Sequence, residues 1–393
     1  MRERIFGLPR NIFLLGLTSL FNDFSSEMIY AVFPAFFTAV LGAGAASLGL
    51  VDGVAEAASN IFKIYSGNLS DKLQARKPLV ITGYTLSVLT RPFYIFVFTV
   101  PGALGLRFLD RVGKGLRDAA RDAIISLSAP RNELGRSFGY HRAMDTIGAI
   151  IGPLVAYLIL SRFPSRFNIV FLTAFGVGAV AIVTLFFVKD VIVPFRSKSA
   201  GSLAALTRFS AGFRLYLAAI LVLSMGSLPV AVLLLKTKSI GLVIADIPLF
   251  YMVYNLSYAG FSMAAGKLSD RMGARIVILA GYAVLLMSYF LLGVAHSVLP
   301  LIFGFLVLGL FPALTDGVQR AFASQLTSDD LRGSGMGWLN AASGFGALVA
   351  GMGGGYLWQA YGPPMAFLAA SVIVVVGLVL LLTSVAIGRR AKF

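Results

Sequence analysis

A six-residue segment occurs twice in this chain of 393 residues, once in each half. Residues 67–72 read Gly-Asn-Leu-Ser-Asp-Lys, and residues 266–271 read Gly-Lys-Leu-Ser-Asp-Arg. Each copy lies between two apolar segments that are long enough to cross a bilayer, which takes about 20 helical residues. A short polar turn that recurs at half the chain length indicates two related helical bundles, and among membrane proteins such a repeat is typical of transporters.

The composition agrees with a membrane protein. Hydrophobic residues make up 58% of the sequence and charged residues only 13%, and the mean hydropathy is +0.86; a soluble domain has no use for so much apolar surface. The formal net charge of +16 comes from Lys and Arg gathered in loops that stay cytoplasmic, so no nucleic-acid partner is expected. The chain has no cysteine, which excludes disulfides, thiolate metal sites and cysteine nucleophiles.

Twelve apolar segments are long enough to span a bilayer, so we predict an all-α membrane protein with twelve transmembrane helices in two pseudo-symmetric six-helix bundles. The approximate spans are 11–40, 47–69, 78–99, 102–126, 135–160, 166–188, 212–236, 244–266, 275–296, 298–324, 334–360 and 363–387. The predicted domains are an N-terminal bundle (residues 1–188), a polar cytoplasmic linker (189–210) and a C-terminal bundle (211–393). Basic residues gather on the side of both termini, which predicts that both termini are cytoplasmic in a bacterial-type inner membrane.

The repeat extends beyond the polar turn. Residues 115–123 align with residues 313–321 at an offset of 198, so that Asp118 falls on Asp316. Gly148 falls on Gly346 at the same offset. Several landmarks at nearly one offset make a chance repeat improbable, and the two halves run in the same direction across the membrane because each holds six spans.

These motifs resemble those of the major facilitator superfamily, whose loop between the second and third spans reads G-x-L-S/A-D-R/K-x-G-R/K-R/K. Both copies match its first part, with Gly67, Leu69, Ser70, Asp71 and Lys72, and with Gly266, Leu268, Ser269, Asp270 and Arg271. The second copy continues the match with Gly273 and Arg275, whereas Gln74 replaces the corresponding Gly in the first copy.

Two further motifs of this family are matched in part. The fourth-span pattern R-x-x-q-G resembles residues 107–111, with Arg111 in place of Gly, and the fifth-span pattern G-x-x-x-G-P resembles residues 148–153 without its closing Gly pair. The resemblance implies a secondary transporter that works by alternating access, usually as a monomer. It also implies that the first, fourth, seventh and tenth spans line a central cavity.

Charged residues within the predicted spans occur almost only in the first half of the chain. A charge near the bilayer centre costs roughly 2.5–3.5 kcal/mol, so such residues mark a functional site by default. Asp23 and Glu27 lie one turn apart on the first span, and their depth matches that of Arg111 and Lys114 on the fourth, beside Asp110. We expect that Asp23 or Glu27 binds and releases the driving proton while Arg111 and Lys114 hold an anionic group. The alternative is that these pairs are static and fix helix packing.

Two other sets of residues are predicted to serve conformational change. Charges at the cytoplasmic ends of spans predict a gate that forms in one conformation and breaks in the other. Its predicted members are Asp71, Arg76, Asp118, Arg121, Asp270, Arg275, Asp316 and Arg320. Gly148, Gly152 and Pro153 predict close packing and a hinge in the fifth span.

The leading functional hypothesis is a secondary active transporter that exports an amphipathic or anionic organic compound, coupled to protons. Divalent-metal efflux is the first alternative, although a chain with no Cys and two His offers a poor site for a soft or borderline metal. A membrane receptor or scaffold that does not transport is the second. No G-x-x-x-x-G-K-S/T nucleotide-binding loop occurs, and no nucleophile–base pair or metal-ligand cluster is evident, so neither an enzyme nor a cofactor is expected. The expected partners are a small molecule, protons and the lipid bilayer.

Overall fold

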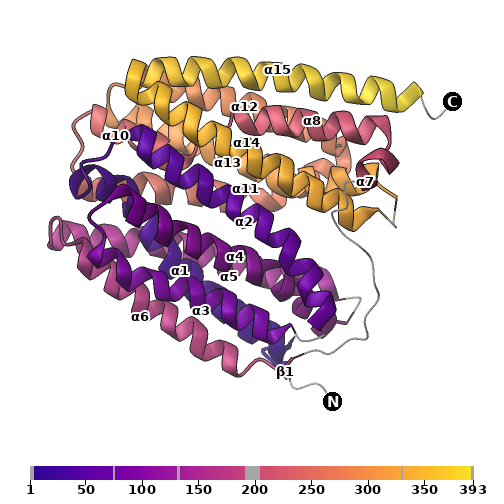
Figure 1. Cartoon of the computed structure of the whole chain (residues 1–393), viewed down its shortest axis with the longest axis horizontal. Helices are drawn as coiled ribbons and strands as arrows, with labels where there is room; N and C mark the ends of the chain where they lie inside the picture. Colours follow the sequence, from indigo (N-terminus) through magenta and orange to yellow (C-terminus); the bar gives the residue numbers. More distant parts are fainter. Residues whose placement is uncertain (1–3, 74–75, 131–132, 191–203, 329–330, 391–393) are drawn as a thin grey trace. The chain divides into compact units, whose positions relative to one another are not determined.

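The computed structural model describes residues 4–73, 76–130, 133–190, 204–328 and 331–390. These residues form an almost entirely helical protein, which confirms the predicted fold class (Figure 1). The elements are β1 (Arg4–Ile5), β2 (Leu8–Pro9), α1 (Arg10–Ala39), α2 (Ala45–Leu73), α3 (Lys77–Phe93), η1 (Tyr94–Phe96), α4 (Val100–Ser128), α5 (Leu134–Arg162), α6 (Phe167–Phe186), α7 (Ala204–Arg208), α8 (Ala211–Met225), α9 (Val230–Leu234), α10 (Lys236–Ser239), η3 (Ile244–Asp246), α11 (Ile247–Met272), α12 (Ala274–Val294), α13 (Val298–Leu326), α14 (Arg332–Tyr361) and α15 (Pro363–Arg390).

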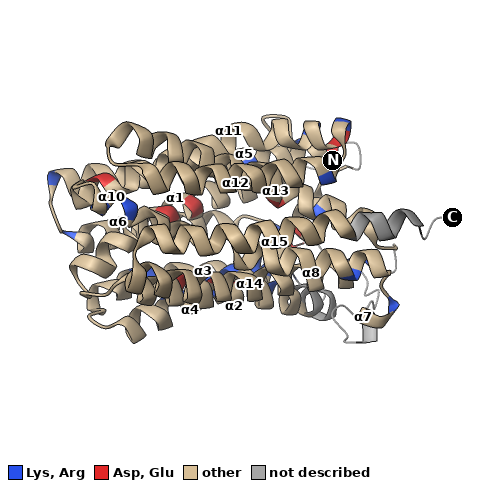
Figure 2. Cartoon of the chain, turned by 90° about the horizontal axis from the view of Figure 1, so that it is seen from above, with Lys and Arg blue, Asp and Glu red and all other residues tan. Residues whose placement is uncertain are grey.

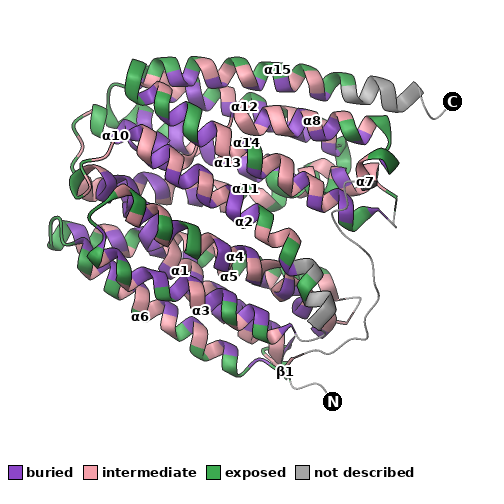
Figure 3. Ribbon diagram, viewed as in Figure 1, coloured by how far each residue is buried: buried purple, intermediate pink, exposed green. Residues whose placement is uncertain are grey.

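Helices occupy all twelve segments that the sequence predicts to cross the membrane. Among the described residues, seven helical segments are long and apolar enough to do so by length and composition alone. The outer helices carry apolar side chains where lipid is expected, and the surface of α15 exposes Leu368, Val372 and Val379 (Figure 3). Helices satisfy their own backbone hydrogen bonds, which is the requirement for a chain that crosses hydrocarbon.

Backbone contacts divide the described residues into two compact units. Unit 1 lies within Met1–Gly42, Ile61–Ser197 and Val243–Met252. Unit 2 lies within Ala43–Asn60, Lys198–Leu242 and Val253–Phe393. Unit 1 therefore holds α1 and α3–α6 with the second half of α2 and the start of α11, and unit 2 holds the other helices. The linker predicted at residues 189–210 lies largely outside the described residues.

The same three helix pairs make the most extensive contacts in each unit. In unit 1 these are α1 with α5, α3 with α4, and α1 with α6. In unit 2 the corresponding pairs are α8 with α14, α12 with α13, and α8 with α15. Glycines at repeat-related positions support the correspondence. A Cβ on Gly148 would lie 2.5 Å from the Leu20 carbonyl oxygen on α1. A Cβ on Gly346 would lie 2.8 Å from the Leu221 carbonyl oxygen on α8. The internal repeat read from the sequence is therefore a repeat of packing.

The seventh predicted span is interrupted, although the sequence pattern predicts one continuous helix over 212–236. Helix α8 ends at Met225 and α9 begins at Val230, because Pro229 has no N–H to continue the helical hydrogen bonds. The Tyr289 hydroxyl donates to the Gly226 carbonyl at 2.9 Å and accepts from the Leu228 N–H at 2.8 Å. One buried side chain on α12 thus satisfies the two backbone groups that the break exposes.

Candidate functional site

The charged side chains predicted to form the site lie on α1 and α4 of unit 1, and Figure 2 colours acidic residues red and basic residues blue along the helices. Asp23 and Glu27 lie one turn apart on α1 and are half-buried. Arg111 and Lys114 lie on α4 and are also half-buried. All four therefore combine partial burial with charge, which is the combination expected of an intramembrane functional site.

Glu27 accepts a hydrogen bond from the Tyr251 hydroxyl, with an O–O distance of 2.6 Å. The Tyr251 ring lies 5.0 Å from the Tyr30 ring, and the Arg107 guanidinium lies 4.8 Å above the Tyr30 ring. We call these four residues the acid–aromatic cluster. The cluster joins a carboxylate, a cation and two aromatic rings, and its Tyr30, Tyr251 and Arg107 side chains are largely buried against one another.

Asp23 is held in a different network. The Asn22 amide donates to the Asp23 carboxylate at 3.0 Å, and the Arg91 guanidinium of α3 donates to the Asn22 oxygen at 2.9 Å. Arg91 also donates to Ser25, which in turn donates to the Ala174 carbonyl of α6. Three helices are therefore tied together beside the Asp23 carboxylate by side chains that are almost completely buried.

The cations of α4 lie within electrostatic reach of both acids. Lys114 acts on the Asp23 and Glu27 carboxylates, and Arg111 acts on Glu27. Asp110 turns instead to its own helix, where its carboxylate lies 3.4 Å from Arg107. Four of the five predicted site residues therefore lie within electrostatic reach of one another across α1 and α4, and Asp110 lies beside the cation of the acid–aromatic cluster.

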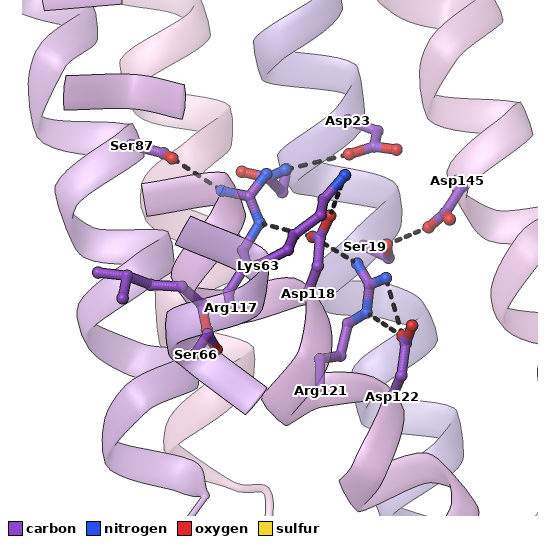
Figure 4. A network of polar contacts seen from close by, with 12 residues as sticks. Ser19, Asp23, Lys63, Ser66, Ser87, Arg117, Asp118, Arg121, Asp122 and Asp145 are labelled. Carbon is purple, nitrogen blue, oxygen red and sulfur yellow. Dashed lines mark hydrogen bonds and ion pairs between the residues drawn. The ribbon is translucent and has the colours of Figure 1, made fainter. Parts of the chain in front are cut away.

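The predicted gate residues of α4 form an ion network in the C-terminal half of that helix (Figure 4). Asp118 lies 3.6 Å from Lys63 of α2, 3.6 Å from Arg121 and 4.0 Å from Arg117. Arg121 also pairs with Asp122 at 2.9 Å. Lys63 of α2 is thus a partner of Asp118, and the sequence analysis did not include it in the gate.

The other predicted gate residues are placed less uniformly. The side chain of Asp71 lies outside the described residues. The Arg76 backbone N–H lies 3.3 Å from the Asp190 carboxylate, and Arg275 donates to the Leu382 carbonyl at 3.0 Å. Asp316 accepts a hydrogen bond from Tyr258 of α11 at 2.9 Å. Asp270 and Arg320 are exposed, and neither forms an ion pair with another side chain in the described part of the chain.

The predicted hinge glycines of α5 lie directly against the two acids of α1. A Cβ on Gly148 would lie 3.1 Å from the Asp23 Cβ, and a Cβ on Gly152 would lie 3.1 Å from the Glu27 Cβ. Each would also come within 2.5 Å of a backbone oxygen of α1, so only glycine permits this approach. Pro153 follows inside the same helix.

Two participants escaped the sequence analysis. Tyr251 stands on the eighth predicted span, where a semi-polar face is visible, yet no pattern in the sequence links it to Glu27 at a separation of 224 residues. Arg91 follows an apolar stretch near the end of the third span, and only its charge within that span could have singled it out. The described residues contain no group of three or more His, Asp or Glu that could hold a metal ion.

Comparison with known proteins gives a match to one family model. The model described as Major Facilitator Superfamily matches residues 15–235 and again residues 215–392. An MFS-type transporter of Methanocaldococcus jannaschii is 35% identical over 383 residues, which is 95% of each chain. A protein of Mycobacterium tuberculosis is 30% identical over 330 residues, which is 80% of this chain and 78% of the relative.

Solved transporters share the fold at low sequence identity. A variant of the nucleoside transporter NupG superposes with a TM-score of 0.81 at 15% identity, covering 95% of this chain and 99% of that chain. A POT family transporter in complex with a thioalcohol-conjugated peptide superposes with a TM-score of 0.80 at 16% identity, covering 99% and 98%. At these identities the likeness extends to the fold alone.

Proposed function

Because the chain belongs to the major facilitator superfamily and is a multi-pass membrane transporter, we propose that it moves an amphipathic organic anion across the membrane in a proton-coupled step. The observation that carries this proposal is the hydrogen bond from Tyr251 to Glu27 beside the Tyr30 ring, with Arg111 and Lys114 of the same unit within electrostatic reach of Glu27. We also propose that the two predicted six-helix bundles move relative to each other and so open the substrate site to one side of the membrane at a time.

The proposed coupling follows from competition for the same cations. When Glu27 is a carboxylate, its negative charge lies within reach of Arg111 and Lys114. When Glu27 carries a proton, these cations are available to a carboxylate, sulfonate or phosphate of the substrate. Proton and anion therefore bind together and move in the same direction.

The aromatic part of the substrate has a place in the same proposal. Tyr30 and Tyr251 lie beside Glu27 as largely buried rings, and we propose that a planar apolar body of the substrate stacks on them when the site opens. A partial relative, the multidrug resistance protein MdtH of Photorhabdus laumondii, is 31% identical over 135 residues, one third of each chain, which supports an organic substrate. Export, the direction in the leading sequence-based hypothesis, would require the opposite linkage, with substrate displacing the proton.

Dyes of one scaffold and opposite charge test this function. The purified full chain is reconstituted into liposomes with sulforhodamine B, a planar anion, or with tetramethylrhodamine methyl ester, a planar cation. We expect an acidic exterior to drive accumulation of sulforhodamine B and not of the cation, relative to protein-free liposomes. Accumulation of the anion under an acidic interior would instead show antiport, and indifference to the pH gradient in both directions would contradict proton coupling.

A further inference from the structure

A second polar chain joins α5 to α1 on the cytoplasmic side of Asp23. The Ser19 hydroxyl donates to Asp145 Oδ1, and His141 Nδ1 lies 3.5 Å from Asp145 Oδ2. His141 and Asp145 are one turn apart on α5, and His141 is only 4% exposed. Figure 4 shows Asp145 turned toward Ser19, with Asp23 on the same helix as Ser19.

Asp145 and Asp23 lie on facing ridges of two closely packed helices. Ser19, which bonds Asp145, precedes Asp23 by one turn of α1. Gly148, which follows Asp145 by almost one turn of α5, is the glycine whose Cβ would lie 3.1 Å from the Asp23 Cβ. The two carboxylates are therefore about one turn apart along the same helix contact, within electrostatic reach of each other.

Other charges face this pair from the neighbouring helices. Lys114, Arg117 and Arg121 of α4 act on Asp23 together with Glu27 of α1. The groups that act on Asp145 are Arg121 and Asp118 of α4 and Arg142 of α5, and those that act on His141 are the same three with Asp122. Cations of α4 and α5 and acids of α1, α4 and α5 are therefore interspersed around the Asp23–Asp145 pair.

The open nitrogen of His141 distinguishes this arrangement from ordinary packing. Nε2 is buried and has no hydrogen-bond partner among the described residues, whereas buried polar atoms are normally paired. Nδ1 faces a carboxylate, and Nε2 remains available to a water or hydronium ion. An imidazole with one nitrogen on a carboxylate and the other open is suited to pass a proton from one nitrogen to the other.

We propose that Asp145 and His141 form a second proton site that carries protons between Asp23 and the cytoplasmic end of α5. The Asp23 carboxyl gives its proton to the Asp145 carboxylate, and Asp145 passes it to Nδ1 of the neutral imidazole. The imidazolium then releases a proton from Nε2, and exchange with water returns the ring to its starting tautomer. Each transfer moves one proton, so charge is conserved at every step. This relay rests on the proposed proton coupling, but its chemistry can be measured without a substrate.

Histidine NMR tests the relay directly, because His141 and His296 are the only two histidines in the chain. The full chain with ¹⁵N-labelled histidine is placed in lipid nanodiscs, and the ring nitrogens are followed against pH, with His296→Gln assigning the signals. We expect the tautomer ratio of His141 to change with pH in the wild type and to stay constant in Asp145→Asn. Asp23→Asn should shift the pH at which the change occurs, and Ser19→Ala should alter it while leaving the helices in place.

The controls separate a relay from a structural role. His296 should respond to none of these substitutions, and Asp316→Asn, the same change in unit 2, should leave His141 unaltered. A pH-independent His141, or an unchanged response in Asp145→Asn, would overturn the relay.

Transport by the same variants separates this inference from the proposed function. Asp145→Asn and His141→Gln should slow pH-driven sulforhodamine B accumulation roughly a hundredfold, the low end of what a positioned acid or base contributes. If wild-type transport ignores pH while the His141 response persists, the proposed function fails and the proton site stands. If transport is proton-coupled and both variants match the wild type, the relay alone fails.

Discussion

Arg91 is a cation enclosed almost completely by protein, with an exposed fraction of 2%. Its two terminal nitrogens are committed to Asn22 and Ser25 of α1, and it therefore orients the residue that bonds Asp23. Glycine at position 178 of α6 leaves room for it, because a Cβ there would lie 2.1 Å from its guanidinium. Such a residue fixes the geometry of a site without touching a substrate.

Arg91→Ala should lower the free energy of unfolding by about 3 kcal/mol or more, because it strips a buried polar network of its central donor and leaves a void. Thermal denaturation of the purified protein in one detergent measures the change. Arg162→Ala, at an exposed helix end, is the matched control and should be neutral. Equal melting temperatures for the two variants would show that the Arg91 network contributes no stability.

Tyr251→Phe should reduce pH-driven transport of sulforhodamine B by roughly tenfold, because a hydrogen bond to a charged group is worth about 1.5–3 kcal/mol. The ring and its contact with Tyr30 remain in this variant, so the loss isolates the hydroxyl that bonds Glu27. Tyr356→Phe removes a hydroxyl from an exposed tyrosine and should transport like the wild type. Wild-type rates in Tyr251→Phe would exclude a role for this hydrogen bond.

At the scale of helices, the sequence predicted all twelve segments because each is an apolar run of bilayer length, a signal local to the segment. The break at Gly226–Pro229 was not predicted, since it depends on Tyr289 from another helix to satisfy the exposed backbone. The carboxylates and cations of α1 and α4 could be paired by depth alone. The contacts of Glu27 with Tyr251 and of Asp118 with Lys63 could not be predicted from the sequence. They depend on how each helix is rotated about its axis and on which helix lies beside it, and a local sequence pattern specifies neither.

Gly148→Ala and Gly346→Ala should each destabilise the protein by about 1–3 kcal/mol, the usual cost of overpacking. The added methyl group meets backbone atoms of α1 at Gly148 and of α8 at Gly346, and these backbone atoms cannot rotate away. Gly176→Ala on α6 is the control, because no atom lies within 4 Å of a Cβ at that position, and it should be neutral or slightly stabilising. Thermal denaturation checks all three. Tolerance of alanine at Gly148 would contradict the close packing of α5 on α1.

At the scale of the whole chain, one packing plan is used twice with different chemistry. The same helix pairs dominate both units, yet the ionic network around Asp118 in unit 1 corresponds to a tyrosine–carboxylate hydrogen bond at Asp316 in unit 2. Sequence repetition is sufficient to predict the shared packing because glycines and apolar positions repeat. The proposed proton chemistry belongs to unit 1, because α8, which packs in unit 2 as α1 does in unit 1, carries no Asp or Glu to match the paired acids of α1.

The absence of cysteine from the sequence makes the predicted sidedness directly measurable. Ser165→Cys lies in the connection between α5 and α6, and Ser328→Cys follows α13. If both termini are cytoplasmic, a membrane-impermeant maleimide applied to intact cells should label the first variant and not the second until the membrane is opened. The reverse pattern would invert the topology.

The central claim is that Glu27 exchanges the proton that drives transport. Two assays are compared: accumulation of sulforhodamine B under an acidic exterior, and its exchange between equal concentrations at one pH. Both are run on the wild type, on Glu27→Gln and on the control Glu133→Gln. Glu133 pairs with Arg4 at the protein surface. We predict that Glu27→Gln retains exchange and loses pH-driven accumulation, while Glu133→Gln retains both. Accumulation by Glu27→Gln at the wild-type level would contradict the account.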